Sequence, residues 1–173
     1  NLFYGFGVYP DPNVHLTTNG GTTWNALTLG ITGNGIYGFA FSSDKIYGIG
    51  VSENSLPTIS RTTNGGVNWS PVNTGSGTYI DFWHRMKWVY GTSVCFLSGE
   101  TSTASIIKKS TDNGATWVTQ TTPAIAELMN IDLVNSSGSV YAYAVAKDGK
   151  VIRLQQLTGI NPVNNNIPAE FKL

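Results

Sequence analysis

The sequence has little charge and no excess of either sign. Only 12% of its residues are Asp, Glu, Lys or Arg, about half the usual share of roughly 25%. Ten basic residues balance ten acidic ones, so the formal net charge is zero. Because nucleic acids and anionic membranes are bound through clustered positive charge, neither kind of partner is expected.

Cysteine and long apolar runs are also scarce. The single cysteine, Cys95, lies between Val94 and Phe96, so no internal disulfide is possible and a small buried hydrophobe is expected. No apolar run approaches the roughly 20 residues that span a bilayer. His15 and His84 have no His or Cys partner at ligand spacing, and phosphate-binding glycine motifs are absent. We therefore predict no metal site and no cofactor.

Glycine, asparagine, threonine and serine are abundant instead. The 173 residues include 20 glycines, and long runs of Leu, Ala, Glu and Lys are absent. This composition is typical of an all-β, turn-rich protein. The length suffices for one domain with a real hydrophobic core.

One eight-residue pattern occurs three times. It places Ser or Thr first, Asn or Asp third, Gly fifth and Trp eighth. The residues at these positions are Thr17, Asn19, Gly21 and Trp24; Thr62, Asn64, Gly66 and Trp69; and Ser110, Asp112, Gly114 and Trp117. The tryptophans are 45 and then 48 residues apart, a period that suits one four-stranded blade of a β-propeller.

Each recurring residue type suits a tight hairpin. An Asn or Asp side chain can accept hydrogen bonds from nearby backbone N–H groups and close a turn. Gly at the fifth position supplies the positive φ that a tight turn needs, and the Ser or Thr hydroxyl can bond the turn from its other side. The Trp offers a large apolar surface for packing against the blade. These roles stabilise structure, and none of them requires catalysis.

The pattern resembles the Asp-box, or BNR repeat, of sialidases, sortilin-type receptors, xyloglucan-degrading glycosidases and photosystem II assembly factor propellers. In those families the box is a structural hairpin, usually between the third and fourth strands of a blade. The resemblance therefore implies a β-propeller. Because enzymes and non-enzymes share this fold, the fold alone does not decide the function.

The other strands fall into register around the repeats and predict an all-β propeller of four-stranded antiparallel blades over residues 1–157. The expected strands are 2–8 and 14–18 in the first blade; 36–41, 46–51 and 58–62 in the second; 79–82, 93–97 and 104–110 in the third; and 128–133, 140–146 and 150–154 in the fourth, with a turn at 147–149. A strand after each Trp completes the first three blades. About four blades are present, and since propellers close with 4–8 blades, more are expected upstream.

The two ends of the chain suggest a secreted precursor. The sequence begins within an expected strand, with neither an initiator Met nor a signal peptide, so we expect a piece of a longer chain. Residues 158–173 are rich in Asn and Pro and predict an extended linker. Residues 167–173 resemble the segment that leads into the C-terminal sorting domain of type IX secretion substrates in Bacteroidetes. That resemblance implies a bacterial protein outside the cell or on its surface.

Two aspartates form the candidate catalytic pair of a glycosidase, which needs two facing carboxylates. Asp81 and Asp132 lie on strands expected to be innermost in the third and fourth blades, where they would line the central channel. The same place in the second blade holds Ala40. The alternative is a repeated structural aspartate that accepts backbone hydrogen bonds at the channel wall.

The resemblance to sialidases implies three arginines that grip a carboxylate, together with a Tyr–Glu nucleophilic pair and an acidic Asp. This chain has three arginines in all, Arg61, Arg85 and Arg153. Arg61 precedes the second Gly-Trp repeat, and Arg153 occupies the related point of the last blade. This recurrence favours a strand position repeated with the fold rather than a substrate grip.

One connection departs from the repeat. The segment from Ile80 to Val94 spans 14 positions, against 9 from Ile131 to Val140, and loops that depart from a repeat often carry its binding function. The candidate partner-binding residues in this insert are Trp83, His84, Arg85, Lys87, Trp88 and Tyr90. Exposed together, such aromatic and basic side chains resemble an interaction hot spot. The alternative is that the aromatic rings pack against an adjacent blade.

These observations favour a non-catalytic extracellular β-propeller that acts as a binding or structural module. The expected partners are another protein, a surface glycan or further copies of the chain. Upstream blades or a second polypeptide should cover the incomplete end blades, because unfinished sheets expose unpaired edges. Two alternatives stay open: a secreted glycosidase with most of its active site on other blades, and a subunit of an extracellular filament.

Overall fold

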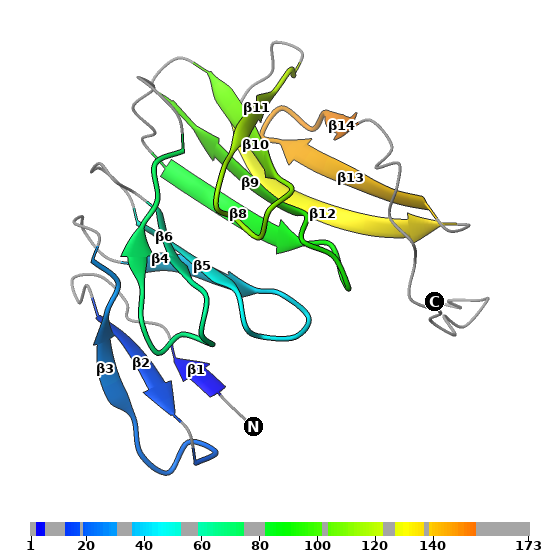
Figure 1. Ribbon diagram of the computed structural model, residues 1–173. Helices are drawn as coiled ribbons and strands as arrows, with labels where there is room; N and C mark the ends of the chain where they lie inside the picture. The colour runs from blue at the N-terminus through cyan, green and yellow to red at the C-terminus, as the bar shows by residue number, and fades with distance from the viewer. Residues whose placement is uncertain are drawn as a thin grey trace, which may run out of the picture.

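The computed structural model describes residues 3–5, 13–17, 19–30, 36–52, 59–74, 82–101, 104–122, 127–136 and 139–154. Within these ranges the chain forms fourteen β-strands in four antiparallel sheets (Figure 1). Each sheet is built from strands that follow one another along the sequence, with the order of the chain kept across the sheet. This up-and-down topology needs only short connections, which the many turn-forming residues supply.

The four sheets are called the first to fourth blades. The first contains β1 (Phe3–Gly5), β2 (Asn13–Thr17) and β3 (Asn25–Thr28); the second β4 (Ile36–Phe41), β5 (Gly48–Ser52), β6 (Ile59–Thr62) and β7 (Ser70–Pro71); the third β8 (Phe82–Trp88), β9 (Cys95–Glu100), β10 (Ser105–Ser110) and β11 (Val118–Gln120); the fourth β12 (Leu128–Ser136), β13 (Ser139–Ala146) and β14 (Val151–Arg153). The strands of the first blade correspond to the three outer strands of the second and third.

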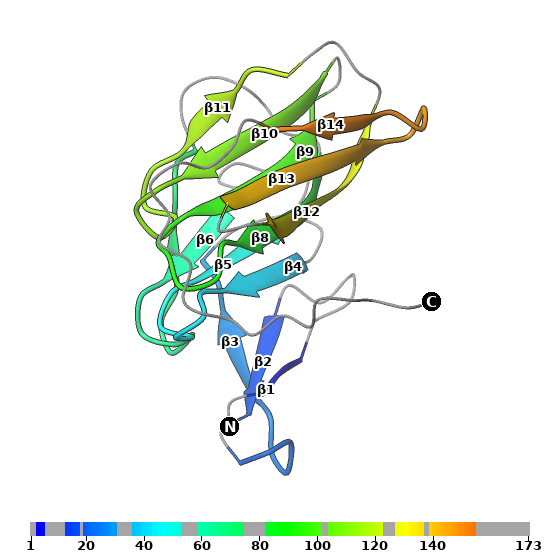
Figure 2. The ribbon, with the colours of Figure 1, turned by 90° about the vertical axis from the view of Figure 1, so that its right-hand side faces the viewer.

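Neighbouring blades meet along their first strands. The strand β8 contacts both β4 and β12, so the first strands of the second, third and fourth blades lie side by side. Figures 1 and 2 show the sheets following one another along an open arc, with the first and fourth blades at its two ends. This is the arrangement of consecutive blades in a β-propeller, and it confirms the fold predicted from the repeats.

The hydrophobic core is divided among the spaces between blades. One apolar cluster, around Val14 and Leu29, joins the first and second blades. A second, around Ile49, joins the second and third, and the largest, around Phe96 and Ile131, joins the third and fourth. Blade-to-blade packing is therefore the main source of apolar burial in the described part of the chain.

The first strands of the second, third and fourth blades each contain a β-bulge near their start. The bulges lie between Ile36 and Gly38, between Trp83 and Arg85, and between Leu128 and Asn130. Because a bulge inserts one extra residue, it shifts which side chains face each neighbouring blade. The repetition of the bulge at one place in three blades makes it a feature of the repeat.

The first strand of the third blade corrects the sequence prediction. That strand was expected to end at residue 82, but β8 runs from Phe82 to Trp88, and the expected residues 79–81 lie outside the described part of the chain. The expected end was too early because the bulge between Trp83 and Arg85 breaks the two-residue alternation by which strands are recognised. Each of the other expected strands overlaps an observed one, and the turn at 147–149 is confirmed by a hydrogen bond of 2.9 Å from Ala146 N–H to the Lys150 carbonyl.

Candidate functional site

The three eight-residue repeats, residues 17–24, 62–69 and 110–117, form hairpins with one shared hydrogen-bond network. We call them the Gly-Trp hairpins. In every copy the first hydroxyl accepts the N–H of the repeat's Gly at 2.9 Å. The oxygen of the Asn or Asp accepts the N–H of the residue before Trp, also at 2.9 Å. The indole N–H donates to the Gly carbonyl at 2.9 to 3.1 Å.

The tryptophans of the hairpins differ in burial according to their place in the arc. Trp117 is 8% exposed and belongs to the cluster between the second and third blades. Trp69 packs on the cluster between the first and second blades and meets the rings of Phe39 and Phe41 edge-on, at 5.6 and 5.9 Å. Trp24 in the first blade is 43% exposed. Each Trp thus packs toward the preceding blade where one is present.

Asp112 gives the third hairpin the only carboxylate at the third position of the repeat. Burial raises the pKa of Asp112, but hydrogen bonds from the hydroxyl and backbone N–H of Thr116, the hydroxyl of Ser110 and the N–H of Ala115 outweigh burial and lower the pKa to about 2. The two hydroxyls lie 2.6 and 2.8 Å from the carboxylate oxygens. The hairpin therefore prefers the charged form.

We expect the third hairpin to lose stability in acid. Because the folded pKa of Asp112 lies below its unfolded value of about 3.9, its contribution is present above that pH and is lost as the pH falls toward about 2. The substitution Asp112→Asn should leave the fold intact near neutral pH, since Asn19 and Asn64 fill the same position, and should flatten this dependence. Urea unfolding at about pH 7 and about pH 3 measures both. An equal loss of stability in acid for both proteins would contradict the prediction.

Asp132, one of the two candidate acids, lies on β12 and is paired with Lys87 of β8. The Lys87 ammonium is 3.0 Å from the Asp132 carboxylate, and the backbone N–H of Leu133 donates to the same oxygen at 2.9 Å. The hydrogen bond from Lys87 lowers the pKa of Asp132, so this side chain is held as a carboxylate and is unsuited to act as a general acid. Asp81 lies outside the described residues, and a facing pair of acids stays a prediction.

The strand register corrects the expected equivalence of the two aspartates. In the ladder between the first two strands of each blade, Asp132 is opposite Tyr143 in the fourth blade and Lys87 is opposite Phe96 in the third. Ala40 holds the same place in the second blade, opposite Ile49. The place of Asp132 in the third blade is therefore held by Lys87, and the assignment of Asp81 to that place is wrong. The longer β8 and its bulge shift the position along the strand, and the two equivalent residues form an ion pair between blades.

The segment expected as an exposed loop, residues 83–90, is mostly strand. Trp83, Arg85, Lys87 and Trp88 belong to β8, as does the backbone of His84, whose side chain lies outside the described part. Trp83 is only 3% exposed and packs between the second and third blades, so it is no exposed anchor. The aromatic rings of Trp83 and Trp88 pack against the adjacent blade, which was the alternative that the sequence left open.

Tyr90 is exposed and lies on one of three connected turns that carry exposed apolar side chains. Tyr90, Val67 and Ile46 are 66%, 59% and 46% exposed, and we call them the turn surface. They lie on three turns at the hairpin end of the second and third blades. Hydrogen bonds connect these turns, from Gly65 N–H to the Ile46 carbonyl at 2.8 Å and from Gly91 N–H to a serine hydroxyl of the second blade at 3.1 Å.

Ile46 and Val67 were missed in the sequence. The signal that could have found them is a β-branched apolar residue inside a turn sequence, because such residues favour strands and interiors. Ile46 ends the run Ser42-Ser43-Asp44-Lys45, and Val67 follows the two glycines of the second hairpin. The turn conformation alone does not account for the exposure of Ile46 and Val67.

Arg61 and Arg153 occupy equivalent strand positions, as the sequence predicted. Each guanidinium lies over a tyrosine ring, Arg61 over Tyr47 at 5.3 Å and Arg153 over Tyr141 at 5.6 Å. The Nε of Arg61 also donates to the carbonyl of Asn113 in the next blade at 2.7 Å. The described contacts of Arg61 therefore serve the packing of blades.

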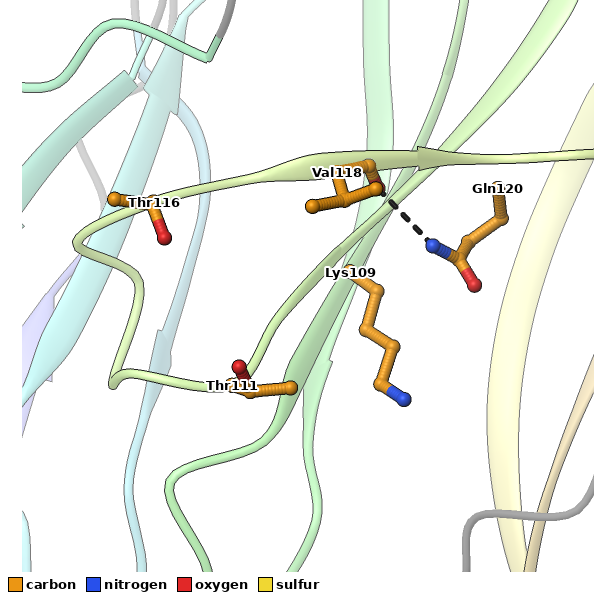
Figure 3. Close-up of a pocket in the computed structure, with 5 residues that line it drawn as sticks. All are labelled: Lys109, Thr111, Thr116, Val118 and Gln120. Carbon is orange, nitrogen blue, oxygen red and sulfur yellow. Dashed lines mark hydrogen bonds between the residues drawn. The ribbon is translucent and has the colours of Figure 1, made fainter.

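A shallow hollow of about 250 Å³ lies on the third blade between β10 and β11 (Figure 3). It is lined by Lys109, Thr111, Thr116, Val118 and Gln120. The Gln120 amide donates to the Val118 carbonyl at 3.2 Å, which occupies part of its polar capacity. These lining residues include no carboxylate or imidazole, so the hollow offers no acid–base pair.

Metal and thiol chemistry have little support in the described ranges. There, no three His, Cys, Asp or Glu side chains come close enough together to hold a metal ion. Cys95 is 2% exposed, and burial raises the pKa of its thiol to about 12. It is the small buried hydrophobe predicted from the sequence.

Across the same described ranges, no helix has the length and apolar character needed to cross a membrane.

The arrangement of the blades is similar to that in a solved structure of YCF48 bound to a D1 peptide. The TM-score is 0.59, with 22% sequence identity, and the match covers 91% of this chain and 49% of that one. The chain therefore spans about half the length of the chain it matches. No protein-family model and no curated protein matches the sequence. Together with the four antiparallel sheets, the likeness shows that this chain has the β-propeller fold.

Proposed function

We propose that the chain is a non-catalytic binding module that holds a segment of another protein on its turn surface. The observation that carries the proposal is the exposure of Ile46, Val67 and Tyr90, 46%, 59% and 66%, on connected turns. Grouped apolar side chains on a rigid scaffold are typical of interaction sites, and Tyr is enriched among the residues that dominate binding energy.

The fold likeness supports a polypeptide as the ligand class. The similar structure of YCF48 holds a D1 peptide, so a propeller of this shape can present a peptide-binding surface. A surface glycan is the other partner that the sequence suggests, because aromatic rings also stack on sugars. The aliphatic side chains of Ile46 and Val67, on turns connected to that of Tyr90, suit apolar peptide side chains better than they suit hydroxyl-rich sugars.

We further propose that the Gly-Trp hairpins are Asp-boxes and that the protein works outside the cell or on its surface. The shared network of Ser/Thr, Asn/Asp, Gly and Trp supports the first assignment. The low charge and the resemblance of residues 167–173 to type IX secretion substrates support the second. The location can be tested by deleting the type IX system from cells that export the full precursor. Export should be lost when that system is absent.

The binding site can be tested with a phage-displayed library of random peptides of about a dozen residues, selected on the intact chain. We expect enriched peptides whose affinity falls at least about tenfold in Tyr90→Ala, since loss of a hot-spot side chain costs about 1–2 kcal/mol or more. Val118→Ala is the matched control, because Val118 is 65% exposed on β11, the outermost strand of the third blade, and is not part of the turn surface.

Two outcomes would contradict this function. One is the absence of any enriched peptide, or equal binding of such peptides by Tyr90→Ala and the unaltered chain. The other is selective binding on a glycan array, or release of the fluorophore from umbelliferyl glycosides, which would favour the glycan-binding or glycosidase alternatives.

A further inference from the structure

The turn between β4 and β5, which carries Ile46 of the turn surface, is held by hydrogen bonds on two sides. The Lys45 N–H donates to the Ser42 carbonyl at 2.9 Å, and the Ile46 carbonyl accepts the Gly65 N–H of the second hairpin at 2.8 Å. The backbone of Lys45 also lies close to that hairpin, because a Cβ added at Gly65 would be 3.4 Å from the Lys45 carbonyl oxygen. Lys45 and Ile46 are therefore fixed relative to the hairpin that carries Val67.

Lys45 adopts a backbone conformation that favours glycine. Its φ is 60°, in the left-handed region where a Cβ crowds the following carbonyl oxygen and costs free energy that glycine avoids. Among the described residues, the other non-glycine residue with a positive φ is Asn113, and Asn enters this region more readily. The turn alone gives no reason for a lysine at this position, so the reason is sought in its side chain.

Lys45 is exposed, and within the described ranges its ammonium has no acidic partner. Other lysines are engaged: Lys87, Lys147 and Lys150 each have an ammonium no more than 3.0 Å from a carboxylate oxygen, and Lys108 donates to a backbone carbonyl at 2.7 Å. Lys45 therefore places an unpaired positive charge directly beside the apolar side chains of the turn surface.

The acid that precedes Lys45 in the sequence, Asp44, is engaged by its own turn. One oxygen of its carboxylate accepts the Ser42 hydroxyl at 2.5 Å and the Ile46 N–H at 2.9 Å. These hydrogen bonds, that of the hydroxyl above all, lower the pKa of Asp44. The Asp44 carboxylate thus closes the turn, whereas the Lys45 ammonium remains available to a carboxylate from another molecule.

We propose that the turn surface selects acidic peptides, namely extended segments of another protein in which an Asp or Glu lies close to an apolar residue. The inference rests on the peptide-binding function proposed above and names the chemistry of its ligand. In this contact the peptide carboxylate accepts hydrogen bonds from the Lys45 ammonium, while the apolar side chain packs on Ile46, Val67 and Tyr90. Because Lys45 directly precedes Ile46 and an extended chain advances about 3.3 Å per residue, the acid is expected within about three residues of the apolar residue.

The ion pair contributes selectivity more than affinity. An exposed ion pair changes an equilibrium by up to about fivefold, and charges at the rim of an interface act mainly on the association rate and on its dependence on salt. The apolar side chains of the turn surface therefore supply most of the binding. The sign of the charge at position 45 then decides between acidic and basic peptides.

The peptides selected on the intact chain test this ligand class. We expect Asp or Glu to be enriched near an apolar residue, and Lys and Arg to be depleted. A selected peptide, synthesised with both ends blocked so that only its side chains are charged, should bind Lys45→Gln about three- to fivefold more weakly and Lys45→Glu at least about tenfold more weakly, because like charges then repel. Fluorescence anisotropy measures the affinities. Raising the salt from about 50 to about 500 mM should weaken binding to the unaltered chain more than binding to Lys45→Gln.

Two further variants separate the charge of Lys45 from its backbone. Lys45→Gly should keep the turn, since glycine adopts the left-handed φ without strain, yet should bind the acidic peptide as weakly as Lys45→Gln does. Lys109→Gln is the matched control, because Lys109 on β10 also lacks an acidic partner among the described residues and is not part of the turn surface; its affinity should be unchanged.

The outcomes distinguish this inference from the function on which it rests. Peptides whose binding depends on Tyr90 but that are not enriched in acidic residues, or that bind Lys45→Gln as tightly as the unaltered chain, would overturn the selection of acidic peptides and leave peptide binding standing. A library that yields no enriched peptide would overturn both.

Discussion

Trp117→Ala is expected to lower the free energy of unfolding by about 3–5 kcal/mol, the range found when a large buried aromatic side chain is removed. Trp117 is 8% exposed and fills the space between the second and third blades. Its removal leaves a cavity against Ile49 and takes away the indole N–H that the Gly114 carbonyl accepts at 3.1 Å. Urea unfolding followed by circular dichroism measures the change.

Trp24→Ala provides the comparison, because the hairpin and its hydrogen bond are the same. The Trp24 indole donates to the Gly21 carbonyl at 3.1 Å, but its ring is 43% exposed. We expect a loss of about 1 kcal/mol, close to that of one hydrogen bond. Equal losses for Trp24→Ala and Trp117→Ala would show that the hairpin alone, and not packing between blades, sets the contribution of the Trp.

The Gly-Trp hairpins could be predicted from the sequence because their interactions are local. Every hydrogen bond of the network joins residues no more than four positions apart. The identity of each side chain therefore determines its partner without knowledge of the rest of the fold. The regular spacing of the tryptophans then gave the blades, and the propeller followed from the blades.

The candidate site was harder to predict because it depends on contacts between blades. Trp24, Trp69 and Trp117 have the same local pattern, yet the exposure of Trp24 is 43% and that of Trp117 is 8%. A side chain cannot reveal from its own repeat whether a neighbouring sheet covers it. The same reason explains why the sequence left open whether Trp83 is exposed or, as the structure shows, packs against an adjacent blade.

The bulge in β8 is the second source of error. A pattern search assumes that side chains alternate strictly along a strand, and one inserted residue exchanges the two faces from that point onward. Lys87 therefore holds the place on β8 that corresponds to Asp132 on β12, and these two side chains form an ion pair. The repeated bulges in β4 and β12 would have located this position, had the three strands been aligned on them.

Gly114→Ala combines two costs and should be almost as damaging as the loss of Trp117. Gly114 has a φ of 78°, in the left-handed region that costs a residue with a Cβ about 1–2 kcal/mol. Its added Cβ would also lie 2.5 Å from the Cδ1 of Ile49, which is 1% exposed and packs in the cluster between the second and third blades, so that the Ile49 side chain would have to shift. Overpacking of this kind costs about 1–3 kcal/mol, so we expect a total loss of about 2–5 kcal/mol in urea unfolding.

Gly149→Ala separates the two costs. Gly149 has nearly the same φ, 81°, but an added Cβ would meet nothing within 4 Å, so only the backbone cost of about 1–2 kcal/mol should appear. On β5 of the second blade, Ile49→Val removes the Cδ1 atom that the new Cβ at position 114 meets first, and it should therefore recover part of the loss caused by Gly114→Ala. A double-mutant cycle measures this coupling. If Gly114→Ala cost no more than Gly149→Ala, or if Ile49→Val recovered nothing, the close approach of the third hairpin to the preceding blade would be refuted.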